Sequence, residues 1–174
     1  MDYLMKNLLI AIDLDGVMVN LDPQLDEEFK IANEPTRTHK ALDKVWDQID
    51  ENHSFWYNLP PMENYELLYR KILEKCPLPI VLSATPYSYG FDERHERCKA
   101  QKIAWVNRYL GPAQALRTII TKSNLKQTFI AKIPADKHVL LDDHIANINR
   151  WNAAGGHGIH HTSYHTSLSE LESL

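Results

Sequence analysis

The sequence predicts an α/β fold, in which helices cover both faces of a parallel β-sheet. Three observations support this prediction. Apolar runs alternate along the 174-residue chain with segments of helical periodicity, as in strands joined by helical crossovers. The run Leu8–Ile12 has no polar break, which is typical of a strand buried on both faces. Residues 18–57 show helical spacing without any strand pattern, which predicts a small insertion after the first strand.

The insertion contains two helical stripes. Asp22 and Pro23 are typical of a helix start, with proline at the first helical position. Apolar residues then recur at helical spacing. The first stripe consists of Leu25, Phe29 and Ala32, and the second of Leu42, Val45, Trp46 and Ile49. We therefore assign residues 18–57 to the insertion, and residues 1–17 and 58–174 to the α/β core.

The rest of the chain repeats the order of helix and strand. Pro77 and Pro79 end one helix, because proline cannot continue it. Gly111 and Pro112 end a longer helix. The expected elements are helix 62–75, strand 80–82, helix 93–109, strand 116–121, helix 123–132, strand 139–141, helix 145–154, strand 158–161 and helix 167–174.

Composition argues against several classes of protein. The net charge is −4 and no long basic run occurs, which argues against a binder of duplex nucleic acid. Cys76 and Cys98 are too few for a disulfide framework, so we expect a reduced, intracellular setting. Residues 1–7 lead into the first strand without a cleavage site, and no apolar run approaches membrane-spanning length. We expect a soluble, cytoplasmic protein.

Acidic pairs follow two of the expected strands. Asp13 and Asp15 follow the first strand, with Gly16 allowing a sharp turn, and Asp142 and Asp143 follow strand 139–141. The carboxyl ends of parallel strands share one edge of a sheet, so these acids converge if the two strands are neighbours. Close carboxylates repel each other unless a cation lies between them. Mg²⁺ is the expected cation, because it binds carboxylates and keeps water and phosphate ligands.

The order of these motifs resembles that of the haloacid dehalogenase-like (HAD) phosphohydrolases. The resemblance rests on D-L-D-G-V after the first strand, Ser83 after the second, a lysine further on, and L-L-D-D after a later strand. It covers nearly the whole chain and implies a Rossmann-like core, with residues 18–57 as a type-1 cap. F-W-Y-N-L-P-P-M and N-I-N-R-W-N-A-A-G-G-H-G-I also resemble segments of the 5′(3′)-deoxyribonucleotidase branch and of similar phage or bacterial nucleotidase-like proteins.

This resemblance implies catalytic roles for the acids. Asp13 would be the nucleophile that forms an aspartyl-phosphate. Asp15 would protonate the leaving group and then activate water. Mg²⁺ would bind Asp13, the carbonyl of Asp15 and Asp143, with Asp142 either binding it directly or lying just behind the ligands.

The resemblance also implies a set of phosphate-binding groups. Ser83 and the backbone N–H of Ala84 would bind a phosphoryl oxygen. A lysine near the start of the helix before the last acidic strand would bind the phosphate, and Lys126 fits this position best. Lys122 and Lys132 remain alternatives.

Two further groups of residues have both a structural and a functional interpretation. Phe55 and Trp56 could stack on a nucleobase, but aromatic residues before a double proline more often fill a domain junction. Four histidines, His157, His160, His161 and His165, lie near the C-terminus. His160 and His161 would point to opposite faces of a strand, so exposed histidines are favoured over a zinc site.

The sequence therefore favours a Mg²⁺-dependent phosphomonoester hydrolase that acts on a small phosphorylated substrate, plausibly a nucleotide. The complete acid set argues for catalysis, because a protein that only binds phosphate has no need of Asp15. The alternatives are a 3′-phosphatase on nucleic-acid ends and a non-catalytic protein that binds phosphate or a partner on the same scaffold.

Overall fold

Five parallel strands form one sheet through the middle of the molecule. The computed structural model describes residues 7–22, 25 and 39–174 of the chain. Within these residues the strands are β1 (Leu8–Ile12), β2 (Ile80–Ala84), β3 (Thr118–Thr121), β4 (Lys137–Asp142) and β5 (His157–His160). Their order across the sheet is β3-β2-β1-β4-β5. The predicted Rossmann-like α/β fold is confirmed.

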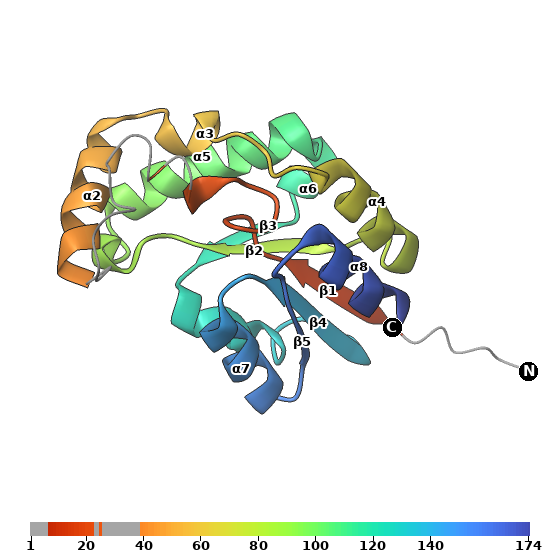
Figure 1. The fold of residues 1–174 in the computed structure, drawn as a ribbon. Coiled ribbons are helices and arrows are strands. Elements are labelled where there is room, and N and C mark those ends of the chain that lie inside the picture. The colour runs from red at the N-terminus through yellow and green to blue at the C-terminus, as the bar shows by residue number, and fades with distance from the viewer. Residues whose placement is uncertain (1–6, 23–24, 26–38) are drawn as a thin grey trace, which may run out of the picture.

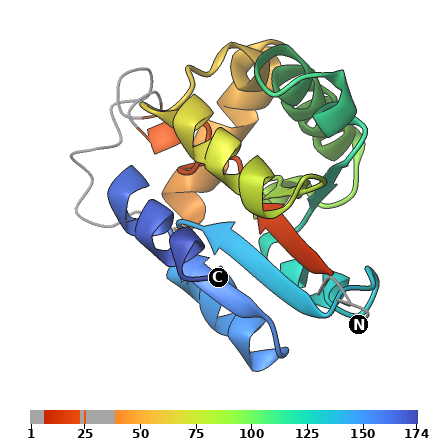
Figure 2. The same ribbon diagram turned by 90° about the vertical axis from the view of Figure 1, so that its right-hand side faces the viewer.

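Helices cover both faces of this sheet (Figures 1 and 2). Leu9 and Ala11 of β1 lie in a core with Trp151, whereas Ile10 and Ile12 lie in a second core with Trp105. This alternation follows from the pleat of a strand, which points successive side chains to opposite faces. The first face is covered by α7 (Ile145–Ala153) and the 3₁₀ helix η3 (Ser123–Phe129), and the second by α4 (Tyr65–Lys75), α5 (Glu93–Tyr109) and α8 (Tyr164–Glu172).

Several elements differ from the predicted ones. The segment after β3 forms η3 rather than an α-helix. Gly111 does end the long helix, but Pro112 begins another short one, α6 (Pro112–Ala115), because proline suits the first helical position. The last helix starts three residues earlier than predicted, where Ser163 and Thr166 form a capping box. A further 3₁₀ turn, η2 (Tyr87–Tyr89), occurs in a segment predicted as a loop.

The described part of the insertion lies beside α5. It comprises α2 (His39–Glu51) and α3 (Phe55–Asn58). Ion pairs join α2 to the first half of α5, with Arg94 3.1 Å from Asp47 and Arg97 2.5 Å from Asp50. The predicted helix that begins at Pro23 lies outside the described residues except for Leu25, so a separate cap at 18–57 stays a prediction.

No helix in the described ranges is both long and apolar enough to span a membrane.

Candidate active site

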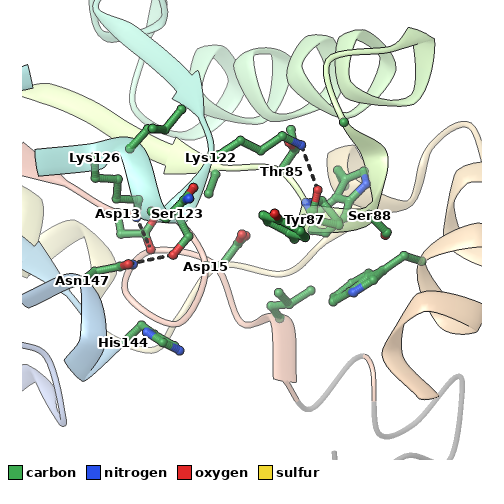
Figure 3. A pocket seen from close by; sticks show the side chains of 18 of the residues that line it. Asp13, Asp15, Thr85, Tyr87, Ser88, Lys122, Ser123, Lys126, His144 and Asn147 are labelled. Atoms are coloured by element: carbon green, nitrogen blue, oxygen red, sulfur yellow. Dashed lines mark hydrogen bonds and ion pairs between the residues drawn. The ribbon is translucent and has the colours of Figure 1, made fainter. Parts of the chain in front are cut away.

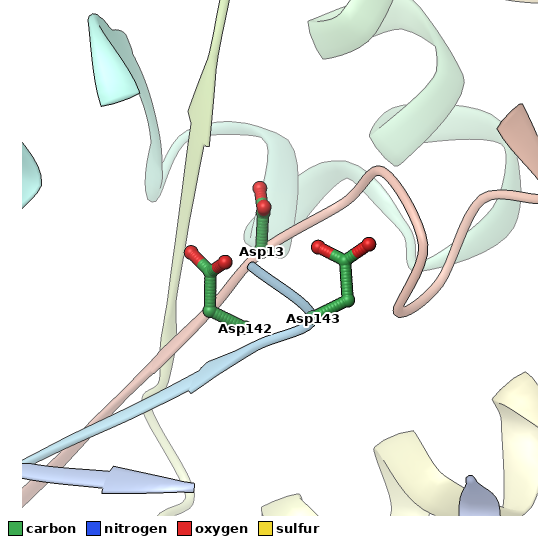
Figure 4. A group of neighbouring side chains, drawn as sticks. All are labelled: Asp13, Asp142 and Asp143. Atoms are coloured by element: carbon green, nitrogen blue, oxygen red, sulfur yellow. The ribbon is translucent and has the colours of Figure 1, made fainter. Parts of the chain in front are cut away.

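The acidic pairs meet where β1 and β4 end. These strands are neighbours, with Ile12 opposite Leu141, and the N–H of Asp13 donates to the Leu141 carbonyl at 2.9 Å. Asp13, Asp142 and Asp143 each bring a carboxylate oxygen within 4.8 Å of the others. Figure 4 shows the three side chains rising on the same side of the strand ends. The predicted convergence of carboxylates from both ends of the chain is therefore present.

Lys126 joins two of these acids. Its ammonium donates to Asp142 Oδ2 at 2.7 Å and lies 2.8 Å from Asp13 Oδ2. Lys126 is only 1% exposed. Burial alone would lower its pKa, but the two carboxylates together raise it. Lys126 is therefore a buried, charged donor beside the expected nucleophile.

Asp142 and Asp143 are neighbours with different surroundings. Asp142 is fully buried and accepts hydrogen bonds from the His144 N–H and from the side-chain amide of Asn147, in addition to that from Lys126. The carboxylate of Asp143 accepts none from the described residues, although its backbone carbonyl accepts one from His160. Partial burial and the charges of the acids around it, Asp13 first, raise the pKa of Asp143 to about 8. Asp143 is therefore the acid with free lone pairs.

Gly16 allows Asp143 to lie against the turn that follows β1. The Leu14 carbonyl accepts hydrogen bonds from the N–H groups of Val17, Met18 and Val19, and the chain therefore turns sharply. Gly16 has φ +74°, and a Cβ there would lie 2.0 Å from Asp143 Oδ2. Glycine is therefore required at this position both by the backbone conformation and by the close approach.

Asp15 pairs with a residue that the sequence analysis missed. Lys102 of α5 forms an ion pair with Asp15 Oδ2 and also donates to the Ala84 carbonyl at 2.7 Å. Its ammonium lies 3.3 Å from Ser83 Oγ and 4.6 Å from the centre of the Trp56 ring. Burial raises the pKa of Asp15, and Lys102 opposes this rise.

A sequence signal for Lys102 does exist. Cys98, Lys102 and Trp105 follow each other at intervals of four and three residues, so they share one face of a helix. Cys98 and Trp105 are apolar and buried. A lysine between two apolar residues on one helix face is a candidate for burial, and a buried lysine needs a partner.

A cavity of about 1210 Å³ opens above the acids (Figure 3). Six of the nine predicted site residues line it, namely Asp13, Asp15, Trp56, Ala84, Lys126 and Asp143. Asp142, Ser83 and Phe55 are not in its lining. Ser83 is fully buried with its hydroxyl toward Lys102, and Phe55 belongs to the core. The structure thus brings most, but not all, of the predicted site residues to one cavity.

The two alternative lysines do not contact the acids. Lys122 lines the same cavity, where it donates to Thr85 Oγ1 at 2.8 Å and to the Pro86 carbonyl at 2.9 Å. Lys132 is exposed and lies over the ring of Phe129. Among the three lysines, Lys126 is the one that contacts Asp13.

The C-terminal histidines do not form a metal-binding group within the described residues. His160 Nε2 donates to the Asp143 carbonyl at 2.8 Å. His161 is buried against the Ser167 hydroxyl at 2.7 Å, so the expectation that it is exposed is wrong. His157 and His165 are exposed, as predicted.

The acid group fits a hard divalent cation. Its donors are carboxylate oxygens that approach one another closely, and Asp143 has lone pairs left to offer. Mg²⁺ prefers such oxygen ligands and takes few of them from protein. The residues present are therefore compatible with Mg²⁺ at Asp13 and Asp143.

Comparison with solved structures supports the fold. A crystal structure described as that of a candidate haloacid dehalogenase-like hydrolase from Burkholderia xenovorans LB400 matches with a TM-score of 0.52. The two sequences are 15% identical, and the match covers 86% of this chain and 78% of that one. No protein-family model and no curated protein matches the sequence. The chain therefore shares the fold of this HAD-like structure.

Proposed function

We propose that this chain is a Mg²⁺-dependent phosphomonoester hydrolase that works through an aspartyl-phosphate at Asp13. The observation that carries the proposal is the arrangement of Asp13, Asp15, Lys126 and Asp143 around one cavity at the carboxyl edge of a parallel sheet. The acids that follow β1 and those at the end of β4 meet there, and Asp13 and Asp142 share a buried lysine. A phosphoryl-transfer site needs both the acids and the buried lysine.

Asp13 attacks phosphorus, and the bond from phosphorus to the ester oxygen breaks. The Leu14 N–H bonds Asp13 Oδ1 at 2.8 Å and Lys126 bonds Oδ2, so the carboxylate is held in one orientation before it reacts. Lys126 also places positive charge where the phosphoryl oxygens bind. These contacts orient the nucleophile and favour the charge of the transition state.

Asp15 gives its proton to the leaving ester oxygen, and it then takes a proton from the water that attacks the aspartyl-phosphate. Phosphate is released and Asp13 is restored. Burial raises the pKa of Asp15, which favours the protonated form required for the first step. The ion pair with Lys102 keeps the carboxyl directed into the site.

Mg²⁺ would be held by Asp13, Asp143 and the carbonyl of Asp15, and would neutralise phosphoryl oxygens. Asp142 accepts hydrogen bonds at both oxygens, so it would orient Lys126 and Asn147 rather than bind the ion.

We propose a nucleotide as the substrate because aromatic side chains line the cavity. Trp46 and Trp56 stack with their ring centres 5.9 Å apart. Tyr87 and Phe91 line the cavity and are 80% and 71% exposed. Exposed aromatic faces stack well on nucleobases. Phe55 and Trp56 are each only 3% exposed and belong to the core, so Tyr87 and Phe91 are the better candidates for this contact.

The test is a panel of nucleotides and sugar phosphates assayed with Mg²⁺. We expect phosphate release from at least one nucleotide, loss of this release on chelation of the metal, and no release by Asp13→Asn. Asp136→Asn is the matched control, since Asp136 is an exposed carboxylate just before β4, at the opposite edge of the sheet. It should retain full activity.

Undiminished hydrolysis by Asp13→Asn would contradict the proposal. The same assay separates the alternatives. Turnover of 3′-phosphorylated oligonucleotides alone would indicate a phosphatase of nucleic-acid ends, and binding without any turnover would indicate a non-catalytic protein.

A further inference from the structure

Two buried lysines, Lys122 and Lys126, line the cavity, a third, Lys102, lies behind Asp15 in its wall, and one of the three lacks a carboxylate partner. Lys126 pairs with Asp13 and Asp142, and Lys102 pairs with Asp15. Lys122 is only 5% exposed, yet no carboxylate of the described residues lies within 4.0 Å of its ammonium. A buried charge without a counter-ion is strongly unfavourable. Lys122 therefore carries a buried positive charge that an anionic ligand would neutralise.

The contacts of Lys122 leave one donor free. An ammonium carries three N–H groups, and the two recorded acceptors are the neutral Thr85 hydroxyl and Pro86 carbonyl. Thr85 also shares a hydrogen bond of 2.9 Å with His95 Nδ1. Burial and then Lys122 lower the pKa of His95, which is therefore neutral at neutral pH. None of these neighbours supplies negative charge.

Ser88 provides a second, independent observation. Its hydroxyl oxygen is buried without a hydrogen-bond partner, and the residue lines the same cavity. Ser88 lies two residues after Pro86 in the chain, and the Pro86 carbonyl accepts a hydrogen bond from Lys122. Figure 3 shows Thr85, Ser88 and the end of Lys122 on one side of the cavity, and Asp13, Lys126 and Asn147 on the other. Buried polar groups in proteins are normally paired, so an orphaned hydroxyl points to a missing ligand.

The sheet register shows that Thr85, which contacts Lys122, lies well beyond the level of Asp13 along the strands. Ile12 lies opposite Val81, so Asp13 lies at the level of Leu82, whereas Thr85 is three residues further along β2. At about 3.3 Å per residue this offset is on the order of 10 Å. A phosphoryl group at Asp13 would therefore not be the group that Lys122 binds.

We propose that Lys122 and Ser88 form a second anion subsite, which binds another phosphate group of the same substrate. The substrate class is then a phosphomonoester that carries a second phosphate, such as a nucleoside bisphosphate. This inference rests on the proposed function, because it assumes that one phosphoryl group lies at Asp13. The ring of Phe91 lies 5.4 Å from the Lys122 ammonium, at the edge of this subsite.

Calorimetric binding to Asp13→Asn, with Mg²⁺ present, tests the subsite without any need for turnover. The two probes are thymidine 5′-monophosphate and thymidine 3′,5′-bisphosphate, which share base and sugar. We expect the bisphosphate to bind at least about tenfold more tightly, as one good charge-assisted contact permits. Adding Lys122→Met should abolish this preference, Ser88→Ala should reduce it, and Lys122→Arg should restore part of it.

Lys132→Met is the matched control, because Lys132 is exposed and lies over Phe129. It should leave the preference unchanged. Lys122→Met should fold with at least the thermal stability of the parent protein, since it removes an unpaired buried charge.

Equal affinities for the two nucleotides, or a preference that survives Lys122→Met, would overturn the second subsite and leave the proposed function intact. Failure of both nucleotides to bind Asp13→Asn, together with no hydrolysis of either by the parent enzyme, would overturn the two proposals together.

Discussion

Gly16 and Asp143 come from opposite ends of the chain, and their contact sets the geometry of the proposed metal site. The carboxylate of Asp143 lies where a side chain on Gly16 would be. The carboxylate of the neighbouring Asp142 is fixed by hydrogen bonds from Lys126, His144 and Asn147 and cannot turn toward a metal ion. A single backbone position therefore decides whether the acid with free lone pairs can face Asp13.

Gly16→Ala should weaken Mg²⁺ binding by at least about tenfold. The new Cβ would lie 2.0 Å from Asp143 Oδ2 and displace it, and loss of a supporting contact of a metal ligand costs about 10–100-fold in affinity. The positive φ should also destabilise the fold by about 1–2 kcal/mol. Calorimetric titration with Mg²⁺ and urea unfolding measure the two effects.

Gly111→Ala is the control for backbone strain. Gly111 has φ +94°, but a Cβ there meets nothing within 4 Å. This variant should lose similar stability and keep its Mg²⁺ affinity. Equal Mg²⁺ affinity in Gly16→Ala and Gly111→Ala would contradict the metal site at Asp143.

At the scale of elements, sequence patterns located the strands and long helices but not every irregular segment. The sequence patterns predicted all five strands, and the stop at Gly111 and Pro112 predicted where α5 at 93–109 ends. η3 was expected to be an α-helix, because apolar spacing does not distinguish an α-helix from a 3₁₀ helix over seven residues. The acids were predictable because they follow strands directly.

Lys102 was not predicted, since α5 is rich in charged residues and its lysines resemble a solvated face. Its partner comes from β1, and only tertiary packing brings the two together. Lys102, in the middle of α5, thus contributes to the site through its ion pair with Asp15.

Lys102→Met should lower kcat by about 10²-fold, with little change in KM, because Asp15 would lose the group that orients it. Lys102→Arg should recover part of kcat, and Lys99→Met, which changes an exposed-face lysine paired with Glu96 on the same helix, should be neutral. Steady-state kinetics with the nucleotide that is hydrolysed fastest measure kcat and KM separately. A rise in KM with unchanged kcat would contradict a role for Lys102 in positioning Asp15.

At the scale of the whole molecule, the fold gathers residues from both ends of the chain at one sheet edge. The central position of β1, with β4 on one side and β2 on the other, brings the ends of three strands together. The cavity above them is closed at the side by α2, α3 and the segment after β2. Strand order could not be read from the sequence, but the assumption that the two acid-bearing strands are neighbours was correct.

Two buried histidines predict how stability depends on pH. Burial lowers the pKa of His95 and of His161 from the ordinary value of 6.5. Below pH 6.5 these two histidines bind protons more readily in the unfolded chain than in the folded one, so their contribution to the free energy of unfolding should fall as pH drops through that value, whereas the raised pKa of Asp143 acts in the opposite direction. Urea unfolding at about pH 7.5 and about pH 5.5 measures this loss.

His161→Asn should reduce the loss of stability between these pH values, whereas the exposed His157→Asn should not. An unchanged pH dependence in His161→Asn would show that this histidine is not held neutral by the fold.

Transfer of a phosphoryl group to Asp13 is tested most directly by trapping it on the protein. The parent enzyme, and beside it Asp15→Asn, which lacks the base for the second step and the acid for the first, are each mixed with a phosphate-labelled deoxynucleotide substrate and Mg²⁺, quenched in acid at early times and digested. We expect label on the peptide that contains Asp13, and none when Asp13→Asn is added. Phosphate release by the parent enzyme with no labelled protein at any time, or label on another residue, would contradict an aspartyl-phosphate at Asp13.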